Sequence, residues 1–266
     1  MRRTLWASVV GLAAAVGCGD GQTPSGGEGV VAETSPPPET PMPPAKPDLN
    51  QSFEQATTAA PGESALPPER TLAGKPTAAL HLAVRKAWGE IKLNGPDPVR
   101  VTLSTDAGEV EFTLFPDVAP NHVRNFLALA TVGYFDGLVF ERVVRQEAVS
   151  ADGAPVKVEF LTGGCPTGDG NPGQGHLGYF LKPEFSELTH DEGTVGFWHE
   201  ADDDASGTRF YVTLGPCPVM DGRYTVVGKV SRGMDVLHKV AAGRTKEPEF
   251  ERPAVPTVIR KAEPAR

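Results

Sequence analysis

The sequence predicts a mainly β domain, a closed barrel or a sandwich, over residues 98–262 of the 266-residue chain. Three observations favour this class. Short segments alternate apolar and polar residues, turns rich in glycine and proline separate them, and few segments show helical periodicity. Many short strands combined with few helices are typical of barrels and sandwiches.

The first 18 residues are expected to form a lipoprotein signal peptide. Arg2 and Arg3 give a positive start, and residues 5–16 form an apolar run that is short for a membrane span. Residues 15–18 resemble the lipobox of bacterial lipoproteins, which implies cleavage before Cys18 and a lipid anchor on its sulfur. We therefore expect a membrane-anchored protein of the cell envelope, facing the periplasm or the exterior. Ordinary secretion with a leftover thiol is the alternative.

Residues 19–75 are expected to form a disordered linker between the signal and the domain. They are rich in Pro, Gly, Glu, Thr and Ala, and Phe53 is their only aromatic residue. Such a composition cannot bury enough apolar surface to offset the entropy lost on ordering. A docking segment for a partner protein is the alternative.

Residues 76–95 differ from the linker because they show helical periodicity. Leu80, Val84 and Trp88 form an apolar stripe, and Thr77 could cap the start of the helix. This pattern predicts a short amphipathic helix that packs on the following domain.

The predicted elements of the domain begin with a hairpin and a helix. Segments 99–103 and 108–114 alternate as hairpin strands do. The helix over residues 121–131 has Asn121 as its expected N-cap. The other predicted elements are strands at 138–144, 156–161, 210–214 and 225–230 and a second helix at 233–241.

The strand over residues 138–144 carries an arginine among apolar side chains. Its period of two predicts that Arg142 shares a face with Phe140 and Val144, while Glu141 points to the opposite face. An arginine in this setting either snorkels at the mouth of a barrel or serves a site.

Five blocks of sequence, in the same order, resemble the cyclophilin family. One of them reads Gly-Tyr-Phe-Asp-Gly-Leu-Val-Phe-Glu-Arg-Val. The resemblance implies an eight-stranded antiparallel β-barrel, closed and capped by two α-helices, and isomerisation of the peptide bond that precedes proline. The blocks are residues 119–126, 133–143, 163–170, 210–213 and 220–230.

Prolyl isomerisation matches the residues that the chain offers. Rotation about an amide bond meets a barrier of about 18–20 kcal/mol. Lowering it requires an apolar pocket for the proline ring and a fixed donor to the imide nitrogen, without a nucleophile, metal or cofactor. Arginine suits this role because it stays protonated and presents a rigid fork of donors. The resemblance places Arg142 at the position of the family's catalytic arginine.

The expected substrate site departs from the family at its polar positions. Thr162 replaces a glutamine that can orient the substrate carbonyl, and a threonine reaches less far. The chain is therefore expected to be either a prolyl isomerase that assists the folding of exported proteins or a module that binds proline-containing segments with weak or no turnover. The expected substrate-binding residues are Phe140, Phe160, Thr162, His199, Arg209, Tyr211, Met220 and Tyr224.

Cysteines and charge give further expectations. By the resemblance, Cys165 and Cys217 lie in loops near the active face, so a disulfide is one interpretation and two separate buried thiols the other.

Residues 202–207 partly mimic a calcium loop but lack its final glutamate, so we expect a solvated acidic loop and no metal. The net charge of -9 argues against nucleic-acid binding. We expect a monomer whose partners are proline-containing segments. A structural envelope lipoprotein without a proline site is a third hypothesis.

Overall fold

The computed structural model describes residues 48–59, 66–149, 153–171, 174–199, 205–247 and 251–265. The chain divides into one unit at Met1–Pro43 and a second at Pro44–Arg266, and the described residues all belong to the second. The signal peptide, Cys18 and most of the predicted linker therefore lie outside the described residues. None of the helices in the described part is both long and apolar enough to cross a membrane.

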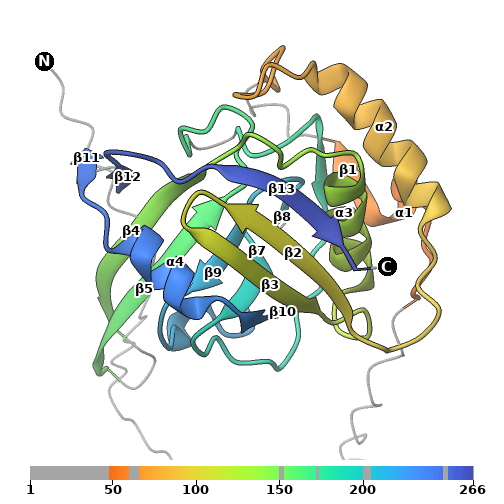
Figure 1. Cartoon of the computed structure of the whole chain (residues 1–266). Coiled ribbons are helices and arrows are strands. Elements are labelled where there is room, and N and C mark those ends of the chain that lie inside the picture. The colour runs from red at the N-terminus through yellow and green to blue at the C-terminus, as the bar shows by residue number, and fades with distance from the viewer. Residues whose placement is uncertain are drawn as a thin grey trace, which may run out of the picture. The chain divides into compact units, whose positions relative to one another are not determined.

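The second unit is built on one curled eight-stranded sheet, shown in Figure 1, in which each pair of neighbours is antiparallel. The strand order is β13-β2-β3-β10-β7-β9-β5-β4. The bounds are β2 (Val99–Thr105), β3 (Gly108–Leu114), β4 (Phe140–Val149), β5 (Pro155–Gly163), β7 (Thr194–Phe197), β9 (Phe210–Thr213), β10 (Thr225–Arg232) and β13 (Ile259–Pro264).

The two edge strands of this sheet approach each other without forming a ladder. An isolated bridge joins Val139, just before β4, to Val258, just before β13. The prediction of a mainly β antiparallel fold is confirmed, and the sheet has the predicted number of strands. Closure by a continuous ladder is not confirmed, so the sheet is a curled half-barrel.

Aromatic side chains fill the interior of the curled sheet. Helix α3 (Pro120–Thr131) places Phe126 against Phe112, Phe135 and Phe210, with ring centroids 5.9, 4.9 and 5.7 Å apart. These rings are fully buried, as are the neighbouring aliphatic side chains. Helix α4 (Met234–Ala241) packs against β3 with its apolar face.

The start of α3 is stabilised by a carboxylate rather than by the predicted N-cap. Asn121 lies inside the helix, and the N-cap residue is Ala119. The Glu184 carboxylate accepts hydrogen bonds from the backbone N–H of Asn121 at 3.1 Å and of His122 at 3.0 Å. A negative charge at this end suits the helix dipole.

Part of the predicted linker is structured and lies on the domain. Helix α1 (Phe53–Ala56) leads into β1 (Thr57–Ala59), which pairs with β6 (Tyr179–Leu181). The Phe53 ring packs edge-on against Trp88 and Tyr179, at 5.5 and 4.9 Å. Arg124 donates hydrogen bonds to the Gln51 carbonyl and to Asn50 as well. Residues 48–59 therefore differ from the expected tether, because specific contacts hold them on the domain.

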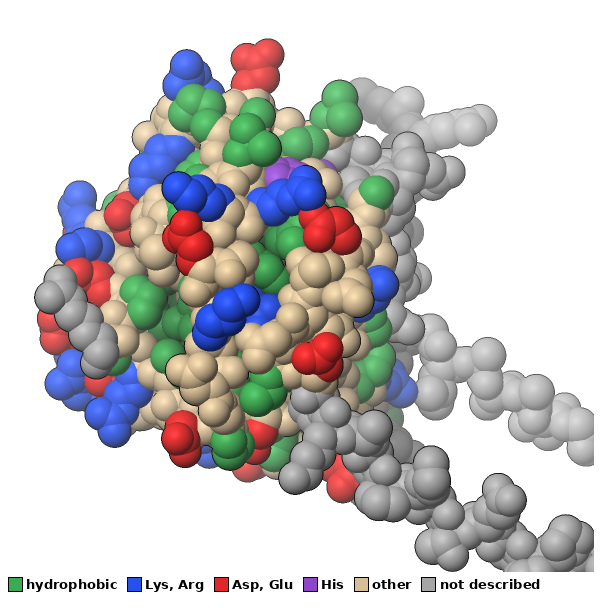
Figure 2. Space-filling model, turned by 90° about the vertical axis from the view of Figure 1, so that its right-hand side faces the viewer, with side chains coloured by type: hydrophobic (Ala, Val, Ile, Leu, Met, Phe, Trp, Pro, Cys, Tyr) green, Lys and Arg blue, Asp and Glu red, His purple; other side chains and the backbone are tan. Residues whose placement is uncertain are grey.

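The second helix lies where the sequence predicts an amphipathic helix. Helix α2 (Thr77–Glu90) buries Leu80, Val84 and Trp88 and packs against α3. On the face shown in Figure 2, acidic and basic side chains are interspersed with hydrophobic ones. The remaining elements are β8 (Ala205–Ser206), the 3-10 helix Pro218–Met220, β11 (Thr245–Glu247) and β12 (Arg252–Pro253).

Candidate functional site

A β-bulge in β4 decides which side chains reach the outer face of the sheet. Phe140 pairs with Gly163 and Arg142 with Thr162, so two steps along β4 match one step along β5. Consecutive residues of a strand point to opposite faces. Phe140 therefore points into the core beside Phe210, at 6.1 Å, and Arg142 points outward. The prediction that Phe140 shares the face of Arg142 is therefore wrong. Its contact with substrate stays a prediction.

The Arg142 side chain is anchored at one of its three nitrogens. Nη2 lies 2.6 Å from Oε2 of Glu251, and the two side chains are 22% and 12% exposed. Nε and Nη1 make no hydrogen bond to any described residue. The aliphatic stem lies against the backbone of Gly170, where a Cβ atom would come within 2.9 Å of Cγ and Cδ. The arrangement fixes the guanidinium and leaves two of its nitrogens available as donors.

A buried ion pair lies beneath this arginine. Nε of Arg209 is 3.3 Å from Oε1 of Glu141, and both side chains are almost completely buried. Burial raises the pKa of the Glu141 carboxyl. The charge of Arg209 opposes that rise, and a hydrogen bond with the Thr162 side chain opposes it to a smaller extent. Thr162 is fully buried. Arg209 is fully buried as well. The expectation that Thr162 and Arg209 contact substrate stays a prediction.

An outer apolar cluster lies on the face toward which Arg142 points. Trp198 is its central ring: the indole lies 5.5 Å from Phe160 and 5.5 Å from Tyr224. Tyr224 and His199 are partly exposed and stack at 4.1 Å. The buried members of this cluster are Val144, Val158, Phe160, Trp198, Tyr211, Cys217 and Met220.

The floor of the outer apolar cluster is tied to a buried histidine. The hydroxyl of Tyr211 lies 2.7 Å from Nε2 of His190, whose Nδ1 lies 2.7 Å from Oδ1 of Asp221. Gly196 permits this arrangement, since a Cβ atom there would sit 2.2 Å from the Tyr211 hydroxyl. Burial lowers the pKa of His190, and Asp221 opposes that change.

The predicted substrate residues thus fall into three groups. Arg142, His199 and Tyr224 are accessible, while Phe160, Tyr211 and Met220 are buried in the outer apolar cluster. The remaining three, Phe140, Thr162 and Arg209, are also fully buried. Phe140 lies in the core of the curled sheet, whereas Thr162 is paired with Tyr211 and the Arg209 guanidinium lies 5.8 Å from the centre of the Trp198 ring.

Sequence reasoning assigned no role to Trp198, His190 or Glu251. The sequence did carry a signal for Trp198: by the resemblance to cyclophilins, this tryptophan stands at a position where the family usually has alanine. Glu251 gave no signal, because its contact with Arg142 joins positions 109 residues apart.

The two domain cysteines are free thiols in different surroundings, so the structure does not contain the hypothesised disulfide. Sγ of Cys165 lies 3.1 Å from Oγ1 of Thr167, whereas Cys217 belongs to the outer apolar cluster. Burial raises the pKa of both thiols.

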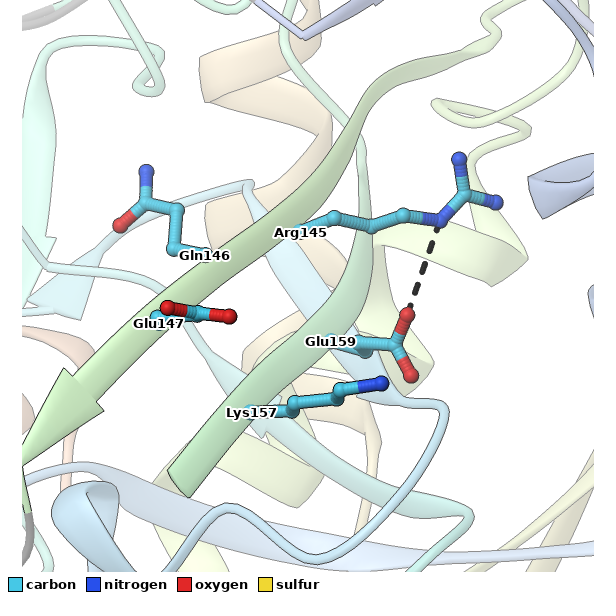
Figure 3. Close-up of a pocket in the computed structure, with 5 residues that line it drawn as sticks. All are labelled: Arg145, Gln146, Glu147, Lys157 and Glu159. Carbon is cyan, nitrogen blue, oxygen red and sulfur yellow. Dashed lines mark ion pairs between the residues drawn. The ribbon is translucent and has the colours of Figure 1, made fainter. Parts of the chain in front are cut away.

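The chain extends β4 and β5 into a hairpin beyond the sheet. A hollow of about 250 Å³ lies on this hairpin. Figure 3 shows the side chains that line it. Its residues are polar, and Arg145 and Glu159 form an ion pair across it at 3.7 Å. This hollow differs in chemistry from a pocket for a proline ring. Its lining residues are Arg145, Gln146, Glu147, Lys157 and Glu159.

A curled antiparallel sheet with an outward arginine beside an apolar cluster defines a cyclophilin-like domain. The sequence model of the family "Cyclophilin type peptidyl-prolyl cis-trans isomerase/CLD" matches residues 100–264. The chain therefore belongs to the cyclophilin type peptidyl-prolyl cis-trans isomerase family. This confirms the predicted enzyme class at the level of the family and is consistent with EC 5.2.1.8.

Individual relatives agree with this assignment. Peptidyl-prolyl cis-trans isomerase B of Bacillus subtilis is 36% identical over 141 residues, covering 53% of this chain and 89% of the relative. Isomerase CYP18-2 of Arabidopsis thaliana is 32% identical over 149 residues, covering 56% of this chain and 84% of the relative. Isomerase cyp15 of Rhizopus delemar is 33% identical over 143 residues, covering 53% of this chain but only 21% of the much longer relative.

A solved structure shows the same fold. It is a cyclophilin type peptidyl-prolyl cis-trans isomerase of Cryptosporidium parvum, with a TM-score of 0.55 and 23% identity, and the match covers 64% of this chain and 98% of that chain.

Proposed function

We propose that the domain isomerises Xaa-Pro bonds in exported proteins and that Arg142 is its catalytic residue. The observation that carries this proposal is the anchored guanidinium of Arg142, which keeps two nitrogens available beside an apolar surface. A donor aimed at the imide nitrogen localises its lone pair as the bond twists, which removes double-bond character.

The residues around Arg142 would position the substrate rather than react with it. Tyr224 offers partly exposed aromatic surface for the proline ring, and His199 stacks on it at the rim of the same surface. No covalent intermediate is required, because only a rotation about one bond is accelerated. The proposed partners are proline-containing segments, bound by a monomer.

A specific observation favours a second candidate, a proline-binding module with weak turnover. Trp198 is almost completely buried against Phe160 and occupies the apolar face on which a proline ring would rest. Thr162, which replaces the family's glutamine, is buried and cannot orient a substrate carbonyl. Both features reduce the support for catalysis while leaving a surface that can bind.

The two candidates are separated by one experiment on the full-length protein purified in detergent. A protease-coupled assay on a Xaa-Pro peptide would measure turnover, and titration calorimetry on the same peptide would measure binding. Turnover well above the spontaneous rate supports the isomerase. Binding without turnover supports the module. If the protein showed neither turnover nor binding, both candidates would be overturned.

We also propose that the protein is anchored in the cell envelope through Cys18. The support is the signal-like composition of the first 18 residues and the lipobox-like residues before the cysteine. Cell fractionation of a Cys18→Ala variant tests this. The variant should leave the membrane fraction or fail to be processed, and unchanged membrane partitioning with normal cleavage would contradict the proposal.

A further inference from the structure

Glu251 contacts β4 through both its backbone and its side chain. Its carbonyl oxygen accepts a hydrogen bond from the backbone N–H of Val143 at 2.8 Å. Its carboxylate faces Arg142, Arg145 and Gln146. Residues from the far end of the domain thus meet the strand that carries the proposed catalytic residue.

The two carboxylate oxygens of Glu251 have separate partners. Oε1 accepts hydrogen bonds from the Arg145 backbone N–H at 3.4 Å and from Nε2 of Gln146 at 3.1 Å. Oε2 accepts the bond from Nη2 of Arg142 at 2.6 Å. Groups other than Arg142 therefore hold the carboxylate, so the carboxylate fixes the arginine rather than the reverse.

The segment that carries Glu251 is itself fastened to a second loop. Nε of Arg252 donates to the Asp169 carbonyl at 2.9 Å, and Nη2 donates to Oδ1 of Asn171 at 2.6 Å. Gly170, between these two loop residues, lies against the stem of Arg142. Glu251 has a positive φ of 57°, a conformation that non-glycine residues rarely adopt, and these contacts hold it there.

We infer that Glu251 is a positioning residue for Arg142, an inference that rests on the proposed isomerase function. The polar side chain expected to support the site, Thr162, is buried and does not reach the surface. Glu251 holds one guanidinium nitrogen and leaves Nε and Nη1 to meet the substrate. The rigid fork of arginine makes this division effective, because fixing one nitrogen orients the other two.

The experiment compares isomerase kinetics of the wild type, Glu251→Ala and Glu251→Gln at a temperature where circular dichroism shows all three folded. Because the group acts on the reacting geometry, Glu251→Ala should lower kcat by about tenfold and leave KM within about twofold. Glu251→Gln keeps an acceptor and should restore part of kcat. Glu109→Ala is the matched control: it removes a carboxylate from an exposed pair with Arg232 and should change neither parameter.

A double-variant comparison tests whether Glu251 acts through Arg142. Adding Glu251→Ala to Arg142→Ala should cause no further loss of activity. A further loss of about tenfold, or a faster Glu251→Ala enzyme, would overturn the inference. The faster enzyme would mean that the carboxylate competes with substrate for the arginine.

The failure of the proposed function can be told apart from the failure of this inference. If the wild type has no isomerase activity, the proposed function fails, and nuclear magnetic resonance of the Arg142 guanidinium then decides the positioning role. Faster rotation and proton exchange of Nη2 in Glu251→Ala would support the anchor. Unchanged guanidinium dynamics would overturn it.

Discussion

The indole of Trp198 lies against the ring of Phe160 with centroids 5.5 Å apart and an interplanar angle of 32°. On the proposed function, this contact covers the part of the outer apolar cluster where a proline ring would otherwise rest. The packing of one side chain therefore controls how much apolar surface the site offers to a substrate.

Replacing Trp198 is expected to open the site at a cost in stability. Trp198→Ala should raise kcat/KM for Xaa-Pro peptides, because it uncovers Phe160 and Tyr211, and should lower the free energy of unfolding by about 3 kcal/mol. Trp198→Phe should lie between the wild type and Trp198→Ala in both properties. Urea denaturation and the protease-coupled assay measure the two effects. Lower activity in a folded Trp198→Ala protein would show instead that the indole binds substrate.

Arg142→Ala is expected to remove the proposed catalytic donor without unfolding the domain, since the side chain is partly exposed. Loss of a charged hydrogen bond worth about 1.5–3 kcal/mol corresponds to a rate reduction of about tenfold to over a hundredfold. Arg142→Lys should not restore the rate, because an ammonium group lacks the planar fork. Retained activity in a folded Arg142→Ala protein would rule out catalysis through this residue.

Removing only one partner of the Glu141–Arg209 ion pair is expected to lower the stability of the domain. Arg209→Met leaves a buried carboxylate without its partner and should lower the free energy of unfolding by about 3–5 kcal/mol. The double variant Glu141→Leu with Arg209→Met should recover most of this loss. Equilibrium urea denaturation measures both. A single variant that costs less than about 1 kcal/mol would contradict the idea of a dry ion pair.

His190 is expected to make stability fall in mild acid. Burial lowers its pKa below the usual 6.5, with Asp221 opposing, so the unfolded state binds more protons than the folded state in this range. The free energy of unfolding should therefore rise with pH between the folded and unfolded pKa values and be lost as the pH falls below about 6.5, by at most about 1.4 kcal/mol per pH unit. The part of the pH dependence of stability that His190 causes should be absent in the His190→Gln variant. Identical pH profiles for the two proteins would refute it.

Thiol titration should find both domain cysteines reduced. In a Cys18→Ala background, two thiols should react after denaturation without reductant, and neither should react quickly in the native protein, because burial raises the pKa of both. If no thiol reacted after denaturation, the two cysteines would be bridged in the exported protein.

Local sequence signals predicted most of the regular elements but missed β7 and β13 of the main sheet, and they were insufficient for the surface of the site. The hairpin of β2 and β3 and the helix α3 follow from period and turn residues, and the structure contains both. The bulge at Phe140 has no local signature, so alternation alone placed this side chain on the wrong face. The Arg142–Glu251 contact depends on tertiary docking, which no local pattern encodes. The segment around Phe53 was predicted to be disordered for a related reason. Its single aromatic ring packs on Trp88, a tertiary contact that the local composition does not indicate.

The same long-range contact has a consequence for when the protein becomes active. Glu251 follows Arg142 by 109 positions, and β13, which pairs with β2, comes later still. A chain that emerges with its N-terminus first, from the ribosome or across a membrane, therefore presents all the other proposed site residues before the residue that orients Arg142. Until β13 has emerged, β2 lacks one of its two neighbours and presents an open edge. On the proposed role of Glu251, isomerase activity begins only when the segment that carries Glu251 has docked on β4.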